Sequence, residues 1–85
     1  MTAAELYALR KRWALTQEAL AMRMGLQRRG YIRLETAEQP IRRAHILVLE
    51  RISIDMAVDR SDLTLMLPGV RYIVDHLLAL GLESD

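Results

Sequence analysis

Three arginines lie close together in one short stretch of the chain, GLQRRGYIRLE, which covers residues 25–35. Arg28, Arg29 and Arg33 fall within six positions. An arginine side chain can bind a DNA phosphate, or pair with both O6 and N7 of a guanine in the major groove. This stretch therefore indicates binding to nucleic acid, and the alternative is a basic loop exposed to solvent.

The spacing of these residues predicts a helix with two different faces. At about 100° per residue, the three arginines and Ile32 fall on one side. Tyr31 and Leu34 fall on the opposite side, and Gly30 lies at the edge of that side. An apolar side chain among arginines can contact a thymine methyl group. We therefore expect a DNA-recognition helix at residues 28–35; the alternative is a solvated basic face with an incidental isoleucine.

The charge of the chain is divided between its two halves. Residues 1–51 contain ten Lys and Arg against five Asp and Glu, whereas residues 52–85 contain two against six. The overall net charge of +1 hides this separation. A basic half suits a polyanionic partner, and an acidic half would be held away from it. Chance segregation in a short chain is the alternative.

Composition argues against several other classes of protein. The 85 residues suffice for one domain, and the absence of Cys excludes disulfides and thiolate metal sites. Neither a signal peptide nor a membrane-spanning apolar run is evident, so we expect a cytoplasmic protein. His45 and His76 share no spacing typical of a metal site, and no catalytic or cofactor motif is evident. We therefore expect no enzyme activity, no metal and no cofactor.

The first half of the chain carries signals for three helices. Thr2 and Glu5 form a capping box before a helix at about residues 3–13. Thr16 is a suitable N-cap for a second helix, which Gly25 should end in a left-handed conformation. The recognition helix is the third.

The second half of the chain is less clearly divided. A fourth helix should open at Pro40, and it either breaks at residues 53–55 or continues for another turn. Residues 61–67 fit a short strand or a helical turn equally well. A last helix should start at Pro68 and stop at Gly81. The fold class is therefore all-α, with five helices expected and four to six allowed.

The segment LRKRWALTQEALAMRMGLQRRGYIRLE resembles the phage-repressor and Cro-like helix-turn-helix family, also called the XRE family. The resemblance covers about residues 5–50. It is strongest over L-T-Q-E-x-L-A-x-x-x-G-L, where Gln17, Ala21 and Gly25 fall in place, and at Glu35. It implies a compact, lambda-repressor-like domain that binds DNA, in a protein that is bacterial or phage-encoded.

The resemblance also implies roles for individual residues. Gln17 matches a glutamine that contacts a DNA phosphate or supports the recognition helix. Arg10 and Glu35 match an ion pair that bridges the first helix to the end of the third. Arg42 and Arg43, at the start of the fourth helix, fit a phosphate contact and plain surface charge equally well. The expected DNA-binding residues are Gln17, Gln27, Arg28, Arg29, Ile32, Arg33, Arg42 and Arg43.

Three positions depart from the pattern of the family. Gln27 stands where Ser or Thr usually caps the recognition helix, so we expect a weak cap. Gly30 inside that helix costs roughly 1 kcal/mol relative to Ala, and Ala37 replaces a common Gly after it. We therefore expect a recognition helix that frays when free and becomes firm on DNA. Gly30 could allow close approach to the second helix or to the DNA backbone.

The chain beyond residue 60 holds more apolar side chains than a small helix-turn-helix core requires. We expect a DNA-binding domain at residues 1–60 and a C-terminal dimerisation segment at residues 61–85, packed on the same domain. Burying apolar surface is favourable by about 25 cal/mol per Å², and a second copy of the chain can provide that burial. Folding back on its own domain is the alternative for this segment. The expected dimer interface comprises Leu63, Leu65, Leu67, Val70, Ile73, Val74, Leu77 and Leu78.

These features predict a homodimeric, sequence-specific regulator that binds a palindromic operator in double-stranded DNA, most simply as a repressor. Two recognition helices about 34 Å apart would contact successive turns of the duplex. A second hypothesis is an antitoxin or other protein-binding adaptor, whose apolar C-terminal half binds a partner protein. A third is a structural helical domain with a degenerate helix-turn-helix.

Overall fold

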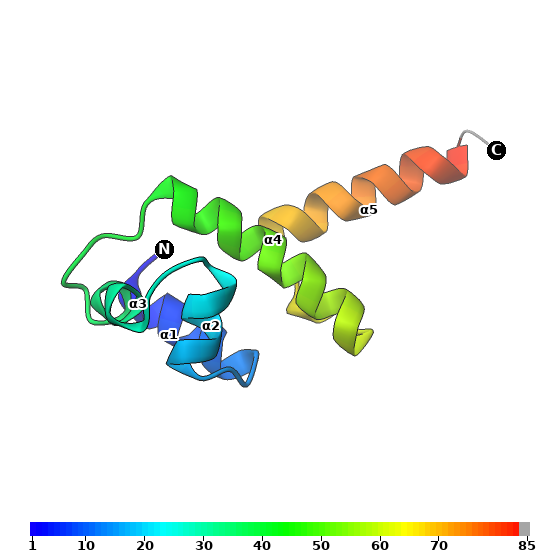
Figure 1. Ribbon diagram of the computed structural model, residues 1–85. Coiled ribbons are helices and arrows are strands. Elements are labelled where there is room, and N and C mark those ends of the chain that lie inside the picture. Colours follow the sequence, from blue (N-terminus) through cyan, green and yellow to red (C-terminus); the bar gives the residue numbers. More distant parts are fainter. Residues whose placement is uncertain (84–85) are drawn as a thin grey trace.

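The chain folds into helices only, with four of them in a body and a fifth that extends from it (Figure 1). The computed structural model describes residues 1–83, and no strand occurs among them. The expected all-α class with five helices is confirmed. The elements are α1 (Ala3–Arg12), α2 (Gln17–Arg23), α3 (Arg28–Glu35), α4 (Arg43–Arg60), a 3-10 turn η1 (Leu63–Leu65) and α5 (Pro68–Glu83).

Local hydrogen bonds define the ends of the first two helices. The Thr2 hydroxyl accepts from the Glu5 N–H at 3.1 Å, and the Glu5 carboxylate accepts from the Thr2 N–H at 3.0 Å. The Thr16 hydroxyl accepts from the Ala19 N–H at 3.0 Å and so caps α2. Gly25, with a φ of 72°, follows Met24, the C-cap of α2. The predicted capping box, N-cap and left-handed helix stop are all confirmed.

The chain turns back on itself after α3. Ala37 adopts a left-handed conformation with a φ of 63°, which costs an alanine more than it would cost a glycine. The Gln39 N–H donates to the Arg33 carbonyl at 2.9 Å. The loop after α3 is therefore folded against the end of that helix.

The predicted start of the fourth helix is wrong. Pro40 lies in the loop, and α4 begins at Arg43. The residues around Pro40 belong to the loop that follows α3. The Arg42 N–H then donates to Nδ1 of His45 at 2.9 Å, which is a capping-box contact. This local cap sets the start of α4 in place of the proline.

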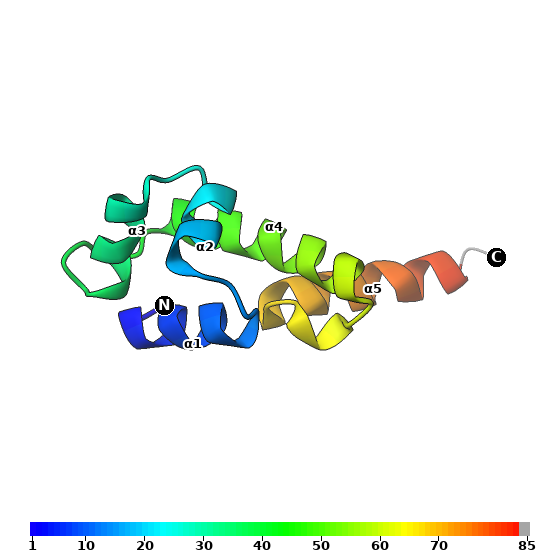
Figure 2. The ribbon, with the colours of Figure 1, turned by 60° about the horizontal axis from the view of Figure 1, so that its bottom comes forward.

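One large core joins the first four helices and η1. Trp13, at the end of α1, is fully buried, and its indole N–H donates to the Leu65 carbonyl at 3.2 Å. Arg12 donates to the Thr64 carbonyl next to it. These bonds join the end of α1 to η1, which lies beside it in Figure 2. The core comprises Leu6, Leu9, Trp13, Leu20, Ala21, Met24, Tyr31, Leu34, Leu49, Ile52, Met56 and Leu65.

The middle of α4 continues without a break through residues 53–55. Ser53 has no exposed surface, and its hydroxyl donates to the Glu50 carbonyl at 2.6 Å. The same hydroxyl accepts from the Leu67 N–H at 3.2 Å. The buried polar group is satisfied, and it also holds the segment after η1 against α4. Residues 61–67 contain the 3-10 turn η1 and no strand, which decides between the two structures that the sequence allowed for them.

The last helix, α5, begins at Pro68 as predicted, but only its first turns pack on the body. Val70 is buried with Ala57 of α4 and Met66, and Val74 is partly buried against them. All residues from 75 to 81 are exposed. Beyond Val74 the helix therefore extends away from the body, and the molecule measures 49 × 23 × 20 Å (Figures 1 and 2).

The end of α5 differs from the prediction. Gly81 does not stop the helix, which continues to Glu83, because Gly81 lacks the positive φ that Gly25 has. The predicted segment 61–85 packs on the body only in its first part, and residues 84 and 85 lie outside the described residues. Over residues 1–83, no helix has the length and apolar character needed to cross a membrane.

Candidate nucleic-acid interface

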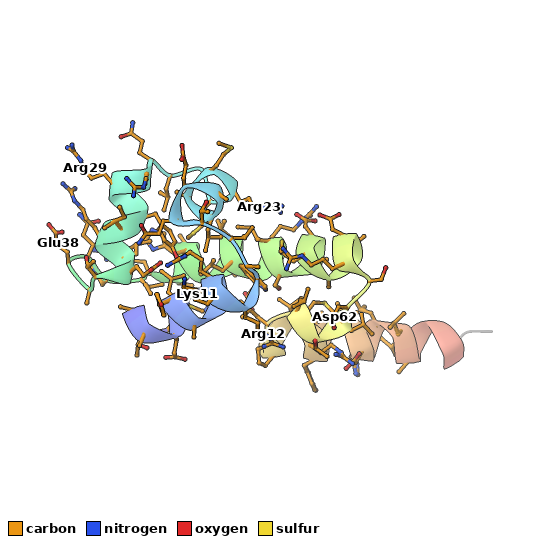
Figure 3. All side chains as sticks on the ribbon, turned by 90° about the horizontal axis from the view of Figure 1, so that it is seen from below. Lys11, Arg12, Arg23, Arg29, Glu38 and Asp62 are labelled. Atoms are coloured by element: carbon orange, nitrogen blue, oxygen red, sulfur yellow. The ribbon has the colours of Figure 1, made fainter. Side chains whose placement is uncertain are left out.

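The outer face of α3 forms one surface hollow with three arginines, an isoleucine and one acid. The opposite face of α3, with Tyr31 and Leu34, is buried in the core. The predicted two-sided helix is confirmed, and Arg29 projects outward from α3 in Figure 3. This arginine hollow is lined by Arg28, Arg29, Ile32, Arg33 and Glu38.

A second hollow adjoins the arginine hollow at the start of α2. Arg28 lines both hollows, so the two are continuous at this residue. Gln17 therefore lies beside the arginine face, as expected. The side chains here supply both hydrogen-bond donors and positive charge, which suits a phosphate backbone. The second hollow is lined by Arg10, Thr16, Gln17, Glu18 and Arg28.

Three residues predicted to bind DNA lie outside both hollows. Gln27 is exposed just before α3, and its side chain makes no cap hydrogen bond, so the expected weak cap is confirmed. Arg42 and Arg43 are exposed at the start of α4. The structure thus gathers Gln17 with the α3 residues and leaves Arg42 and Arg43 beyond the loop that follows α3.

A buried ion pair joins α1 to the end of α3. Arg10 donates from Nε to Glu35 Oε2 at 2.9 Å and from Nη2 to Oε1 at 2.7 Å. The two side chains are only 8% and 6% exposed. Arg10 also donates to the Leu15 carbonyl at 3.1 Å, and Gln17 donates to Glu35 at 3.4 Å. The predicted pair is confirmed, and it links α1, α2 and α3 behind the arginine hollow.

This pair alters the proton affinity of three side chains. The hydrogen bonds from Arg10 hold the pKa of Glu35 below its ordinary value, and the same contact raises the pKa of Arg10. Burial, followed by the neighbouring Glu35 carboxylate, raises the pKa of Tyr31. The Tyr31 hydroxyl is buried and makes no hydrogen bond of normal geometry. At neutral pH the pair is therefore fully ionised and Tyr31 is neutral.

The sequence suggested that Gly30 could allow close approach to the second helix, but the structure shows no such approach. A Cβ at this position would meet no atom within 4 Å. The residue has helical backbone angles and no positive φ. Its missing side chain therefore weakens α3 without any packing benefit inside the chain.

Replacing Gly30 with alanine should raise the free energy of unfolding by about 0.5–1 kcal/mol, because alanine restricts the unfolded chain and favours helix. Gly25→Ala is the matched control, since a Cβ there also meets nothing but the φ is 72°. The control should lose about 1 kcal/mol of unfolding free energy. Urea denaturation measures the unfolding free energy of both variants. A loss of stability in Gly30→Ala would contradict the open space at this position. Weaker DNA binding by this variant would indicate that the glycine allows close approach to DNA.

Glu38 is the residue of this surface that the sequence did not reveal. Its Oε1 lies 3.9 Å from Nε of Arg33, and Figure 3 shows it on the same side of the molecule as Arg29. The left-handed Ala37 turns the chain back and brings Glu38 to the arginine hollow. Ala37 stands where such a loop needs a left-handed residue, and this sign in the sequence could have predicted the position of Glu38.

The apolar residues predicted for a dimer interface divide into two groups. Leu65 and Val70 are buried within the chain, and Leu67 and Val74 are partly buried, so half of the predicted set packs internally. Their side chains are used to attach η1 and α5 to α4. The other four are 50–61% exposed: Leu63, Ile73, Leu77 and Leu78. Exposed apolar side chains outside the predicted set include Val58, Tyr72 and Leu80.

No group of three or more His, Cys, Asp or Glu side chains within the described part of the chain is placed to hold a metal ion. The chain matches no protein-family model, no curated protein and no solved structure. Its function is therefore inferred from its own residues and their geometry.

Proposed function

We propose that this chain binds double-stranded DNA in a sequence-dependent manner, with α3 in the major groove. The observation that carries the proposal is the arginine hollow, where three arginines surround Ile32. An α-helix with its side chains is about 10–12 Å across, which suits a major groove about 12 Å wide. The buried side of α3 and the Arg10–Glu35 pair would hold this face in place as it meets DNA.

The arrangement of α2 and α3 supports a helix-turn-helix of the phage-repressor and Cro-like type. The two helices are joined by a short turn through Gly25, after which the Leu26 N–H donates to the Ala21 carbonyl at 2.9 Å. This turn and the ion pair stand where the resemblance to that family places them. In such a motif the first helix supports the second, which enters the groove.

The residues of this surface would make two kinds of contact with DNA, to bases and to phosphates. Arg29 and Arg33 can form paired hydrogen bonds with guanine, and Ile32 can contact a thymine methyl group. Arg28, where the two hollows meet, and Gln17, which lines the second hollow, would contact phosphates. Phosphate contacts would supply affinity at any sequence, and base contacts would supply the preference for an operator. By occupying a promoter, such a protein would act as a transcriptional repressor.

Selection of genomic DNA fragments with the purified chain tests this proposal directly. We expect enrichment of a palindromic site whose half-sites are separated by about 34 Å, or one turn of the duplex. Enrichment without any shared sequence would reduce the function to non-specific DNA binding. Failure to retain any fragment at low salt would overturn the proposal and leave a structural helical domain.

We further propose that α5 pairs with a second copy of the chain. Five large apolar side chains on this helix are 49–73% exposed: Tyr72, Ile73, Leu77, Leu78 and Leu80. Exposed apolar side chains that gather on one helix are typical of a surface that binds another protein chain. Ile73, Leu77 and Leu80 fall on one side of the helix, within about 60° of each other. A two-fold dimer would cover them and would match a palindromic operator.

Leu77→Asp should convert a dimer into a monomer, because the charge would be buried at the centre of the paired surface. Ala79→Asp is the matched control, since Ala79 is also exposed but lies about 160° away around α5. Sedimentation at micromolar concentration would distinguish the variants. A wild-type chain that is already monomeric would contradict the dimer, and would favour the alternative of an adaptor whose α5 binds a partner protein.

A further inference from the structure

Glu38 is the one acidic side chain among the residues that line the arginine hollow. Its carboxylate approaches Arg33 at Nε, at a distance of 3.9 Å. The side chain of Glu38 is 67% exposed and that of Arg33 is 41% exposed. An ion pair with this much exposure adds little to the stability of a fold, so stability does not account for the pair.

The backbone of the loop after α3 holds Glu38 in this place. The Thr36 hydroxyl donates to the Ile32 carbonyl at 2.9 Å, and the Gln39 N–H donates to the Arg33 carbonyl at 2.9 Å. Ala37 between them is left-handed. The loop backbone that carries Glu38 is therefore set by a defined turn, and from it the carboxylate reaches Arg33.

An acid at this position has opposite effects on the two kinds of DNA contact. It repels any phosphate that approaches Arg33, and it competes with that phosphate for the guanidinium. Its contact with Arg33 is at Nε, which leaves the two Nη groups for the O6 and N7 atoms of a guanine. A guanine edge can therefore bind Arg33 without displacing Glu38, whereas a phosphate meets a like charge.

We infer that Glu38 is a specificity-determining residue. It positions Arg33 toward a base edge and lowers the affinity of the same arginine for phosphate. The inference rests on the proposed DNA-binding function and adds a residue that acts through Arg33. It also explains why an acid occupies a surface that otherwise suits a polyanion.

Glu38→Gln tests the inference, because glutamine keeps the shape of the side chain and removes its charge. Binding would be measured on a selected genomic site and on random duplex DNA of equal length, at two salt concentrations. We expect affinity for random DNA to rise roughly fivefold and affinity for the selected site to change less than about twofold, with a steeper salt dependence on random DNA. The midpoint of urea unfolding should not change.

Glu18→Gln is the matched control, since Glu18 is an exposed acid that lines the second hollow. It should raise affinity for both DNAs by the same factor, and leave their ratio unchanged. An equal rise on both DNAs in Glu38→Gln would make Glu38 a general repulsive charge and overturn the inference. A selective loss on the selected site would overturn it too, by making Glu38 a direct contact to a base. If wild-type protein binds neither DNA at low salt, the proposed function itself fails.

Discussion

Glu35→Ala should lower the free energy of unfolding by about 3–5 kcal/mol, because it leaves Arg10 buried without its partner. The Arg10 side chain is only 8% exposed, so the variant removes two hydrogen bonds from a largely buried guanidinium. A small domain has only about 5–15 kcal/mol of stability in total, and the variant would be close to unfolding. Urea denaturation at pH 7 measures the loss.

Glu18→Ala is the control for this change, since Glu18 is exposed and makes no such pair in the described structure. It should alter stability by less than about 0.5 kcal/mol. If Glu35→Ala and Glu18→Ala lost similar amounts, the Arg10–Glu35 pair would not hold α3 against α1.

The contribution of Glu35 should also depend on pH in a defined direction. Because Arg10 holds the pKa of Glu35 below its ordinary value, folding stabilises the charged carboxylate. That stabilisation is complete above the pKa in the unfolded chain, about 4.3, and is lost as pH falls through the lower pKa in the folded protein. The stability difference between wild type and Glu35→Ala should therefore shrink as pH falls below about 4. Unfolding curves between pH 7 and pH 3 would reveal a constant difference if the pair did not matter.

Arg29→Ala and Arg33→Ala should each weaken binding to a selected DNA site by about 1–3 kcal/mol, which is roughly fivefold to 150-fold. Both residues line the arginine hollow, and each can pair with a guanine. Each variant should also accept more sequences at one position of the site. Fluorescence anisotropy with the selected site and with its single-base variants would measure both effects at one salt concentration.

Arg23→Ala is the matched control for these two variants. Arg23 is an exposed arginine of α2 that lines neither hollow, and it lies away from Arg29 in Figure 3. It should change binding by less than about threefold at any sequence. Equal losses on selected and random DNA would assign Arg29 and Arg33 to phosphates. The dependence of log affinity on log salt would then fall by about 0.9 for each contact removed.

The sequence alone was sufficient for features that depend on neighbouring residues. Thr2 with Glu5, Thr16 and Gly25 each begin or end a helix through hydrogen bonds that span only a few positions. The two faces of α3 follow from helical geometry, which puts residues three and four apart on the same side. The location of the arginine face, the buried side of α3 and the all-α class were predictable for this reason.

Tertiary structure decided the features that depend on contacts between distant parts of the chain. The Ser53 hydroxyl lies within the continuous α4 and accepts from the Leu67 N–H, and the sequence around Ser53 contains no sign of that partner. Trp13 binds the Leu65 carbonyl across 52 positions, so η1 packs inward. Leu65, which the sequence predicted for a dimer interface, is therefore buried within the chain.

The arginine face itself illustrates the same division. Helical spacing placed Arg33 on the outer side of α3, but the turn through Ala37 placed Glu38 beside it. That turn depends on a left-handed alanine, which is unfavourable by itself and is held by the hydrogen bond from Gln39 to the end of α3. The sequence by itself determined which side chains α3 presents. The fold alone decided that an acid stands among them, because only the returning loop brings Glu38 to that surface.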